Sequence, residues 1–252
     1  MRDDELRICG LTAVRARFER NPSSIIRLYF DEPTSRKIAP LCRALAATRR
    51  IYRCVEPAEL EKIAGSVHHG GIVAVVAVPA QRVASATDAA QWAKGKEPLV
   101  VLDGIGNAHN LGAIARTAAF FGVPRLAIAG DRTSARPGEA AYRVAEGGLE
   151  FVEIWTVEDI PAFLRALAAA GYDVVGAATR GGKSARGEAG GRKSASPWAL
   201  VLGNEEQGLA QETAAACTRL VTIPGSGRIE SLNVSAAAAV LLHGLVSARP
   251  GR

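Results

Sequence analysis

Three short segments in the C-terminal part of the chain combine polar side chains and glycines where a predicted strand ends and a predicted helix begins. The segments are residues 107–117, 202–209 and 223–237. Loops at the ends of strands are where open α/β sheets bind their ligands. The three segments are far apart in sequence, so they form one site only if the fold brings them together.

The second segment places Glu205 between Gly203 and Gly208. Glycine lets a ligand or another loop lie directly against the main chain, so this loop is a candidate for close backbone contact. In the first segment, Asn110 and Arg116 stand six residues apart at the entry to a predicted helix. Arg116 therefore emerges about two turns after Asn110, which can either cap the helix or shape a site.

The third segment leads into a final helix predicted over residues 233–247. Asn233 or Ser231 can cap it, because a side-chain oxygen there can accept a hydrogen bond from a free backbone N–H. The helix is apolar on nearly all sides, so we expect it to be buried, and its row of alanines lets another backbone approach closely.

These loops require an α/β framework, and the hydrophobic pattern predicts one. Residues 1–79 alternate short strands and helices and form one compact unit, with one helix expected over 35–47. Residues 80–97 read as a linker with a short helix. In residues 98–252, buried strands alternate with helices, beginning with the apolar run at 98–102. Such alternation predicts a mostly parallel sheet covered on both faces.

Composition narrows the class of protein. The chain has 252 residues, 48% hydrophobic and 22% charged, which is typical of globular proteins. No apolar run reaches the roughly 18 residues of a membrane span, and the charged start is unlike a secretory signal, so we expect a cytoplasmic protein. Four scattered cysteines without a CxxC pair indicate reduced thiols, and adjacent His68 and His69 without further ligands make a poor zinc site.

The formal net charge is +6, and arginine far outnumbers lysine. This balance favours a polyanionic partner such as RNA, although a GC-rich genome produces the same bias. The glycine-rich basic tract at 180–193 reads either as a flexible lid or as a solvated insertion. Candidate phosphate contacts in the first unit are Arg15, Arg17, Arg20, Arg36, Lys37, Arg49, Arg50 and Arg53.

The three segments closely resemble motifs 1, 2 and 3 of the SpoU (TrmH-type) RNA 2′-O-ribose methyltransferases of the SPOUT superfamily. The first motif is matched by Asn110, Gly112, Ala113, Ile114, Arg116, Thr117 and Ala118. The second is matched by residues 202–209, and the third by Ile223, Pro224 and residues 231–237. The first unit, with the run at 68–74, resembles the L30e-like RNA-binding domain of many members.

This resemblance implies a deep trefoil knot in the second unit, an obligate homodimer and S-adenosyl-L-methionine as cofactor. It implies cofactor contacts at Gly203, Ile223 and Leu232. It maps the functional polar residues onto Asn110, Arg116, Glu205, Asn233 and Ser235. The implied activity is ribose 2′-O-methylation of structured RNA, with rRNA favoured. The alternatives are a tRNA 2′-O-methyltransferase and a non-catalytic RNA-binding protein that retains the knot.

In this mechanism we expect Arg116 to stabilise the developing alkoxide and to bind the adjacent phosphate, because a guanidinium stays protonated and cannot serve readily as a base. Glu205 is expected to fix Arg116 or backbone amides, or simply to complement a helix N-terminus. Asn233 and Ser235 either position ribose or cofactor, or cap their helix. His109 is a weaker candidate base.

Two further features bear on function. The family often has serine and glycine where this chain has Ala145-Glu146-Gly147-Gly148, so Glu146 would add negative charge near the RNA face. An oxidoreductase on a dinucleotide-binding sheet is disfavoured, because no GxGxxG follows the first strand of either unit.

Overall fold

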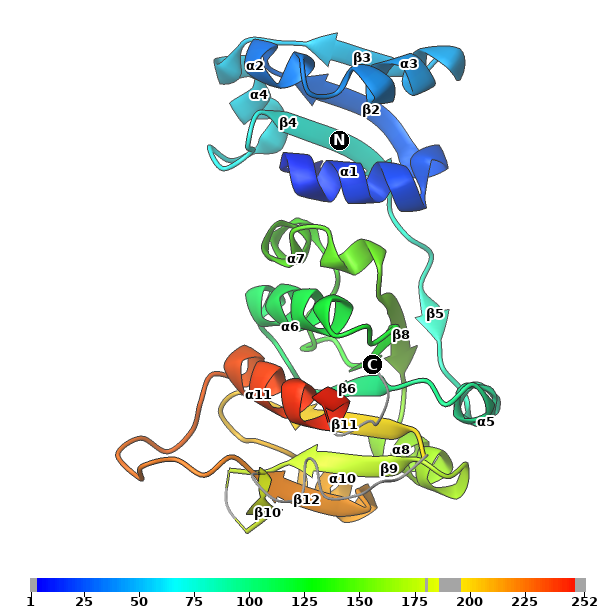
Figure 1. Cartoon of the computed structure of the whole chain (residues 1–252), viewed down its shortest axis with the longest axis vertical. Coiled ribbons are helices and arrows are strands. Elements are labelled where there is room, and N and C mark those ends of the chain that lie inside the picture. Colours follow the sequence, from blue (N-terminus) through cyan, green and yellow to red (C-terminus); the bar gives the residue numbers. More distant parts are fainter. Residues whose placement is uncertain (1–3, 180, 186–195, 248–252) are drawn as a thin grey trace.

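The structure, a computed structural model, describes residues 4–179, 181–185 and 196–247 and contains two α/β units that follow one another along the chain (Figure 1). The first is built on a four-stranded sheet and the second on an eight-stranded sheet. The N-terminal unit lies at the top of Figure 1, with α1 facing α7 of the second unit.

The N-terminal sheet has the strand order β1-β4-β2-β3 and is mixed. Strand β4 pairs antiparallel with β1 and β2, whereas β2 and β3 are parallel. The elements are β1 Glu5–Cys9, α1 Leu11–Arg20, the 3₁₀ turn η1 Pro22–Ser24, β2 Ile25–Phe30, α2 Glu32–Ser35, α3 Ala39–Ala47, β3 Ile51–Cys54, α4 Pro57–Ala64 and β4 Ile72–Ala77.

The prediction of one helix over 35–47 was wrong, because two helices occupy this region. Asp31 caps the short α2 by accepting a hydrogen bond from the Thr34 backbone N–H at 2.9 Å. Pro40 lies in the first turn of α3, where its missing N–H leaves no helical hydrogen bond unmade. The chain therefore starts a second helix after residue 38 instead of continuing the first.

The second sheet has the order β10-β12-β9-β11-β6-β7-β8-β5, and each of its strand pairs is parallel. The predicted α/β fold with a mostly parallel sheet is confirmed. The elements are β5 Arg82–Val83, α5 Ala86–Lys94, β6 Leu99–Asp103, α6 Ala108–Phe120, β7 Arg125–Ala129, α7 Glu139–Ala145, the 3₁₀ turn η2 Gly148–Glu150, β8 Glu153–Val157, α8 Ile160–Ala169, β9 Asp173–Ala177, β10 Lys183–Ser184, β11 Trp198–Gly203, α10 Gln211–Ala216, β12 Arg219–Thr222 and α11 Val234–Ser247.

Both faces of this sheet are covered, as the unbroken apolar runs predicted. In β6, Val100 and Leu102 belong to a cluster with residues of α6 and α11, whereas Leu99 and Val101 belong to a second cluster with residues of α5 and α8. Successive side chains of a strand point to opposite faces, so one strand serves both cores. The carboxyl ends of the strands are thereby held in fixed register.

Residues 80–97 are more than the linker we expected. Strand β5 pairs with β8 and forms the edge of the sheet, and α5 packs on α8. Trp92 is buried, with its ring centroid 5.1 Å from that of Trp155 and 6.2 Å from that of Phe163. This segment therefore completes one edge of the second unit.

The two units meet where β1 and α1 face α7 and η2. The Arg7 guanidinium forms two hydrogen bonds with the Glu139 carboxylate, at 2.5 and 2.8 Å. Arg17 donates to Glu150 at 2.9 Å and to the Tyr142 hydroxyl at 3.0 Å. The side chains of Arg17 and Glu150 are only 4% and 5% exposed. Buried, fully partnered charges of this kind fix the units to one another.

The expectation that α11 is buried on all sides was wrong. Val234, Ala238, Leu241 and Leu245 are buried, whereas Val240 is 48% exposed. The exposed residues form one stripe at helical spacing, because they recur every three or four positions. They are Ala236, Val240, His243 and Ser247.

In the part of the chain that the structure describes, no helix has the length and apolar character needed to cross a membrane. The basic tract at 180–193 falls largely outside the described residues. Within it, β10 adds a short parallel strand beside β12.

Candidate active site

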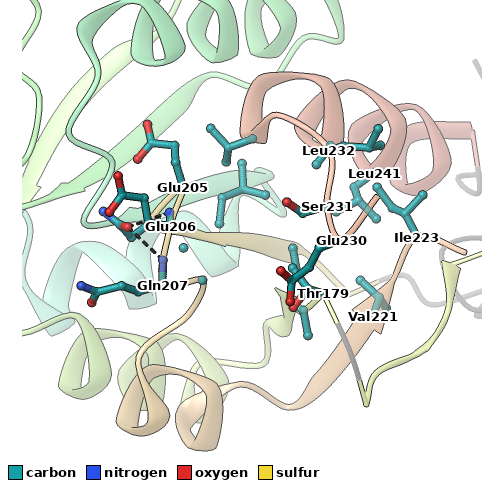
Figure 2. A pocket seen from close by; sticks show the side chains of 18 residues that line it. Thr179, Glu205, Glu206, Gln207, Val221, Ile223, Glu230, Ser231, Leu232 and Leu241 are labelled. Carbon is teal, nitrogen blue, oxygen red and sulfur yellow. Dashed lines mark hydrogen bonds between the residues drawn. The ribbon is translucent and has the colours of Figure 1, made fainter. Parts of the chain in front are cut away.

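A cavity of about 280 Å³ lies at the carboxyl ends of β9, β11 and β12, beside the start of α11 (Figure 2). Its walls come from residues 177–179, 202–208, 221, 223, 230–232, 234, 237 and 241. The second and third motif segments therefore meet at one pocket, although they are separated along the chain by α10 and β12.

The walls of the cavity differ in chemistry from one side to the other. In Figure 2, Val221, Ile223, Leu232 and Leu241 line one side. The polar side carries Glu205, Glu206 and Gln207, with Thr179, Glu230 and Ser231 between the two. An apolar wall with a few convergent polar groups is the usual make-up of a small-molecule site.

Gly203, Ile223 and Leu232, the three predicted cofactor contacts, all line this cavity. At Gly203 a Cβ would lie 2.3 Å from the backbone carbon of Gly208. That spacing is too short for any side chain, so only glycine allows the loop after β11 to close on itself.

Asn204 holds the same loop in shape and was not singled out from the sequence. Its Oδ1 accepts hydrogen bonds from the backbone N–H groups of Glu206 and Gln207, at 2.9 and 3.1 Å. Its Nδ2 donates to the Gly104 carbonyl at 2.7 Å, which ties the loop to the end of β6. The Gly203-Asn204 pair is a turn signal that could have indicated this role.

Asn110 links all three motif segments. Its Nδ2 donates to Glu205 Oε1 at 2.8 Å, and its Oδ1 accepts from Asn233 Nδ2 at 3.1 Å. Asn110 is 9% exposed, whereas Glu205 is half-buried and Asn233 is exposed, so the buried amide joins two groups at the edge of the site. The fold therefore brings together Asn110, Glu205 and Asn233, as the expectation of one shared site requires.

Asparagine side chains cap both α6 and α11. Asn107, not Asn110, caps α6, because its Oδ1 accepts from the His109 backbone N–H at 2.8 Å. Asn110 lies inside the helix and is free to serve the site. Asn233 precedes α11, and its Oδ1 accepts from both the backbone N–H and the hydroxyl of Ser235, at 2.9 and 2.6 Å. Asn233 therefore combines helix capping with its link to Asn110.

Arg116 lies elsewhere on α6. Among the described residues, it is not part of the cavity wall, and its Nη2 forms an ion pair with Glu146 Oε2 at 3.0 Å. Both side chains are 56% exposed. The expectation that Glu205 fixes Arg116 or backbone amides was wrong for its side chain, which accepts from Asn110 instead.

The geometry of α6 explains this separation. Six residues at 100° each place Asn110 and Arg116 about 120° apart around the helix axis. Asn110 faces inward, and Arg116 belongs to an outward stripe with the exposed His109 and Phe120. Phe120 is 83% exposed, so this stripe offers a large apolar side chain beside the arginine.

The arginines predicted to contact phosphates differ in their exposure to solvent. Arg15, Arg49 and Arg53 are exposed, although Arg15 also donates to the Lys37 carbonyl at 2.9 Å. Arg50 is half-buried and donates to the carbonyls of Pro22 and Ile25, both at 2.7 Å. The expectation for Arg17 was wrong, because its guanidinium is buried between the two units.

The loop after β7 contains an aspartate whose pKa is lowered. Partial burial opposes ionisation of Asp131, but hydrogen bonds from Thr133 and Ser134 outweigh it and lower the pKa of Asp131 to about 2. These bonds come from both hydroxyls and both backbone N–H groups, at 2.6–2.8 Å. Asp131 thus orders a loop whose Ala135 N–H donates to the Ile105 carbonyl beside the site.

Among the described residues, no contact supports a histidine as a catalytic base or as a metal ligand. His109 is exposed and does not line the cavity. His69 Nδ1 accepts from the Gly71 backbone N–H at 3.1 Å and stabilises a turn. Across residues 4–179, 181–185 and 196–247, His, Cys, Asp and Glu form no group suited to a metal ion.

Fold and site together define an α/β enzyme with a ligand pocket at the carboxyl edge of a parallel sheet. Residues 97–243 match the SpoU rRNA Methylase family, and residues 7–81 match the RNA 2′-O ribose methyltransferase substrate-binding domain. The chain belongs to the SpoU rRNA methylase family. It is therefore an RNA methyltransferase, as the sequence resemblance predicted.

Named relatives agree with this assignment. The chain is 33% identical over 246 residues to the uncharacterized tRNA/rRNA methyltransferase YfiF of Escherichia coli O157:H7, covering 96% of this chain and 68% of that protein. It is 34% identical to the 23S rRNA (guanosine-2′-O-)-methyltransferase RlmB of Nitrosomonas europaea, covering 93% of this chain and 88% of the relative.

Solved structures share the fold. A putative TrmH-family RNA methyltransferase from Porphyromonas gingivalis superposes with a TM-score of 0.74 at 26% identity, covering 96% of this chain and 90% of that one. The SpoU methyltransferase AviRb from Streptomyces viridochromogenes, in complex with AdoMet, gives a TM-score of 0.73 at 25% identity, covering 99% and 92%.

Proposed function

We propose that this enzyme transfers a methyl group from S-adenosyl-L-methionine to a ribose 2′-hydroxyl of rRNA. The observation that carries the proposal is the hydrogen-bonded chain Glu205–Asn110–Asn233 beside the cavity, in a member of this family. The relatives named RlmB act on 23S rRNA, which supports rRNA as the substrate.

The cavity residues suit this cofactor. An adenine ring needs apolar walls and main-chain hydrogen bonds. The residues that can provide them are Val221, Ile223, Leu232 and Leu241. The sulfonium and ammonium of the cofactor are cationic, and Glu205, Glu206 and Glu230 place carboxylates along the same cavity. When bound, S-adenosyl-L-methionine supplies a methyl group on a positively charged sulfur. The structurally similar methyltransferase AviRb was solved in complex with AdoMet, which supports S-adenosyl-L-methionine as the cofactor.

Each polar residue then has a distinct task. Asn110 orients Glu205 and Asn233, so their remaining hydrogen-bonding groups are held in one geometry toward the ribose. Arg116 lies outside the cavity of its own protomer and would act from the exposed side of α6, where it binds the adjacent RNA phosphate and stabilises negative charge on the 2′-oxygen as its proton leaves. Ser235, held by Asn233, stands at the start of α11 beside them.

The N-terminal unit, residues 1–79, serves as an L30e-like RNA-docking domain in this proposal. Its match to the substrate-binding domain supports this role. Arg15, Arg49 and Arg53 are its exposed phosphate contacts, with Arg50 beside them. Folded RNA is recognised largely by shape and backbone contacts, which suits a separate docking surface with a salt-dependent affinity.

A homodimer is proposed to form through the α6–α11 face, defined by Phe120, Arg116 and the exposed stripe of α11 around Val240. The two helices pack against each other, and the ring centroids of Phe121 and His243 are 6.2 Å apart. Pairing two copies there would bury the exposed apolar side chains and enclose Arg116. The favourable free energy of such burial comes mainly from the apolar area removed from water.

The trefoil knot and the cytoplasmic location also belong to this proposal. After β12, on the far side of β9 from β11, the chain returns past the loop after β11 and packs α11 against α6 and β11. This return path supports a threaded C-terminal segment. An enzyme that modifies bacterial-type rRNA works where ribosomes assemble, which supports the cytoplasm.

Incubation of the protein with labelled S-adenosyl-L-methionine and either rRNA or tRNA tests this proposal. We expect label in rRNA and little in tRNA. Label in tRNA alone would favour a tRNA enzyme. Calorimetric binding of S-adenosylhomocysteine without label in any RNA would favour a non-catalytic RNA-binding protein.

A further inference from the structure

The segment Ala145–Gly148 lies between the two units and touches Arg116 directly. At Gly148 a Cβ would lie 2.7 Å from the Arg116 Cα, so η2 packs against the backbone of α6 at this residue. At Gly147 a Cβ would lie 3.0 Å from the Ala16 Cβ of α1. The segment is therefore held from both sides, by the proposed catalytic helix and by the N-terminal unit.

Glu146 has an unusual backbone conformation in this segment. Its φ of 45° and ψ of 44° lie in the left-handed region, which glycine adopts far more readily than glutamate. The strain is maintained by the packing of the two following glycines. A residue kept in such a conformation is a reason to look for a function of its side chain.

The Glu146 side chain reaches Arg116 and forms the 3.0 Å ion pair with its Nη2. An exposed ion pair contributes little to folding, so stability alone gives no reason for a glutamate here. A guanidinium has five N–H donors, and a carboxylate on Nη2 leaves donors for a phosphate and a 2′-oxygen. The contact can therefore orient Arg116 without occupying all its donors.

We propose that Glu146 is a positioning residue that holds the Arg116 guanidinium for RNA, and this inference rests on the proposed function. The N-terminal unit packs against the residues that follow Glu146. Ala13 and Ala16 lie against Gly147, and Arg17 pairs with Glu150, so the backbone next to Glu146 is held in place. The strained backbone fixes where the carboxylate lies, and the carboxylate fixes the guanidinium.

The variant Glu146→Gly separates positioning from a structural role. Glycine relieves the left-handed strain, so the variant is expected to melt at the same or a higher temperature and to bind S-adenosylhomocysteine normally. Loss of the carboxylate is expected to lower kcat at least fivefold. Lys96→Gly is the matched control, because Lys96 also has a positive φ of 52° but lies just before β6, away from the site. It should leave kcat unchanged.

A second readout does not depend on turnover. The Arg116 Nε–H order parameter from nuclear magnetic resonance should be high in the native protein and fall in Glu146→Gly. Unchanged order, or reduced order with unchanged kcat, would overturn the proposal. If the native protein methylates no RNA, the proposed function fails, and the order parameter still decides whether Glu146 positions Arg116.

Discussion

Asn110 and Glu205 are 95 residues apart in sequence, and their side chains are joined by a 2.8 Å hydrogen bond. The bond connects the first turns of α6 to the loop that follows β11, because β6 and β11 are parallel neighbours whose carboxyl ends coincide. A second hydrogen bond from Asn233 adds the start of α11. The site thus depends on the order of strands in the sheet.

Replacing Asn110 with alanine is expected to affect both stability and activity. The buried Asn110 amide and its two hydrogen bonds would be lost, and because Glu205 is half-buried and Asn233 is exposed, water can replace part of the lost bonding, so we expect a cost of about 1 kcal/mol of unfolding free energy. Without the link between the loops, kcat should fall at least tenfold. Denaturant unfolding and steady-state kinetics measure the two effects, and wild-type kinetics in this variant would contradict the assigned role.

Gly203→Ala should disrupt the cavity more severely than its small size suggests. The added Cβ would meet the Gly208 backbone at 2.3 Å, so the loop must open. Calorimetry should show at least tenfold weaker binding of S-adenosylhomocysteine. Gly225→Ala is the control, because nothing lies within 4 Å of a Cβ there, and its binding should match the native protein.

The buried Arg17–Glu150 pair should hold the two units together. Arg17→Ala leaves Glu150 buried without its cationic partner, and removing one member of such a pair costs about 3–5 kcal/mol. We expect a separate, earlier melting transition of the N-terminal unit by calorimetry. The exposed pair of Arg82 with Glu153 provides the comparison, and Arg82→Ala should cost under about 1 kcal/mol. Equal losses would contradict this account of docking.

Asp131 should make stability depend on pH in the acid range. Its pKa of about 2 in the folded protein lies below the ordinary aspartate value of 3.8, so its contribution to stability is full above pH 3.8 and disappears as pH falls toward 2. Because the residue is exposed, solvent screening limits the effect to roughly 1 kcal/mol. Asp131→Ala should therefore be less stable than the native protein at pH 7 and nearly equal at pH 2. A constant difference in unfolding free energy would rule this out.

The α6–α11 face predicts the oligomeric state. Phe120→Glu would place a charge among side chains that a dimer buries, so this variant should sediment as a monomer while the native protein sediments as a dimer. Val83→Glu changes another exposed apolar residue, 55% exposed in the edge strand β5 and outside the α6–α11 face, and should stay dimeric. A native monomer in analytical ultracentrifugation would contradict the proposed interface.

Sequence reasoning located the cavity well but missed α7. Gly203, Ile223 and Leu232 were predicted from the family resemblance, and they line one cavity because loops after parallel strands share one edge. Helix α7 has only seven residues and no side-chain cap, and it follows a loop rich in arginine, serine and threonine. Short, uncapped helices give little periodic signal.

Missing α7 had consequences for Arg17 and Arg116. Because the sequence did not predict α7, it did not reveal the partners of either arginine. Arg17 was therefore predicted to be an exposed phosphate contact, and Arg116 to be a neighbour of Glu205. Charge and residue type indicate that an arginine needs an anion, but only tertiary packing decides which one. The same holds for α11, whose composition indicated burial although one stripe remains exposed.

The central claim is ribose 2′-O-methylation, and the most direct test is mass spectrometry of nucleosides from rRNA treated with the enzyme and S-adenosyl-L-methionine. We predict a new 2′-O-methylated nucleoside with the native protein and none with Arg116→Ala, whose binding of S-adenosylhomocysteine should be unchanged. A methyl group on a base, or equal 2′-O-methylation by both proteins, would contradict the account.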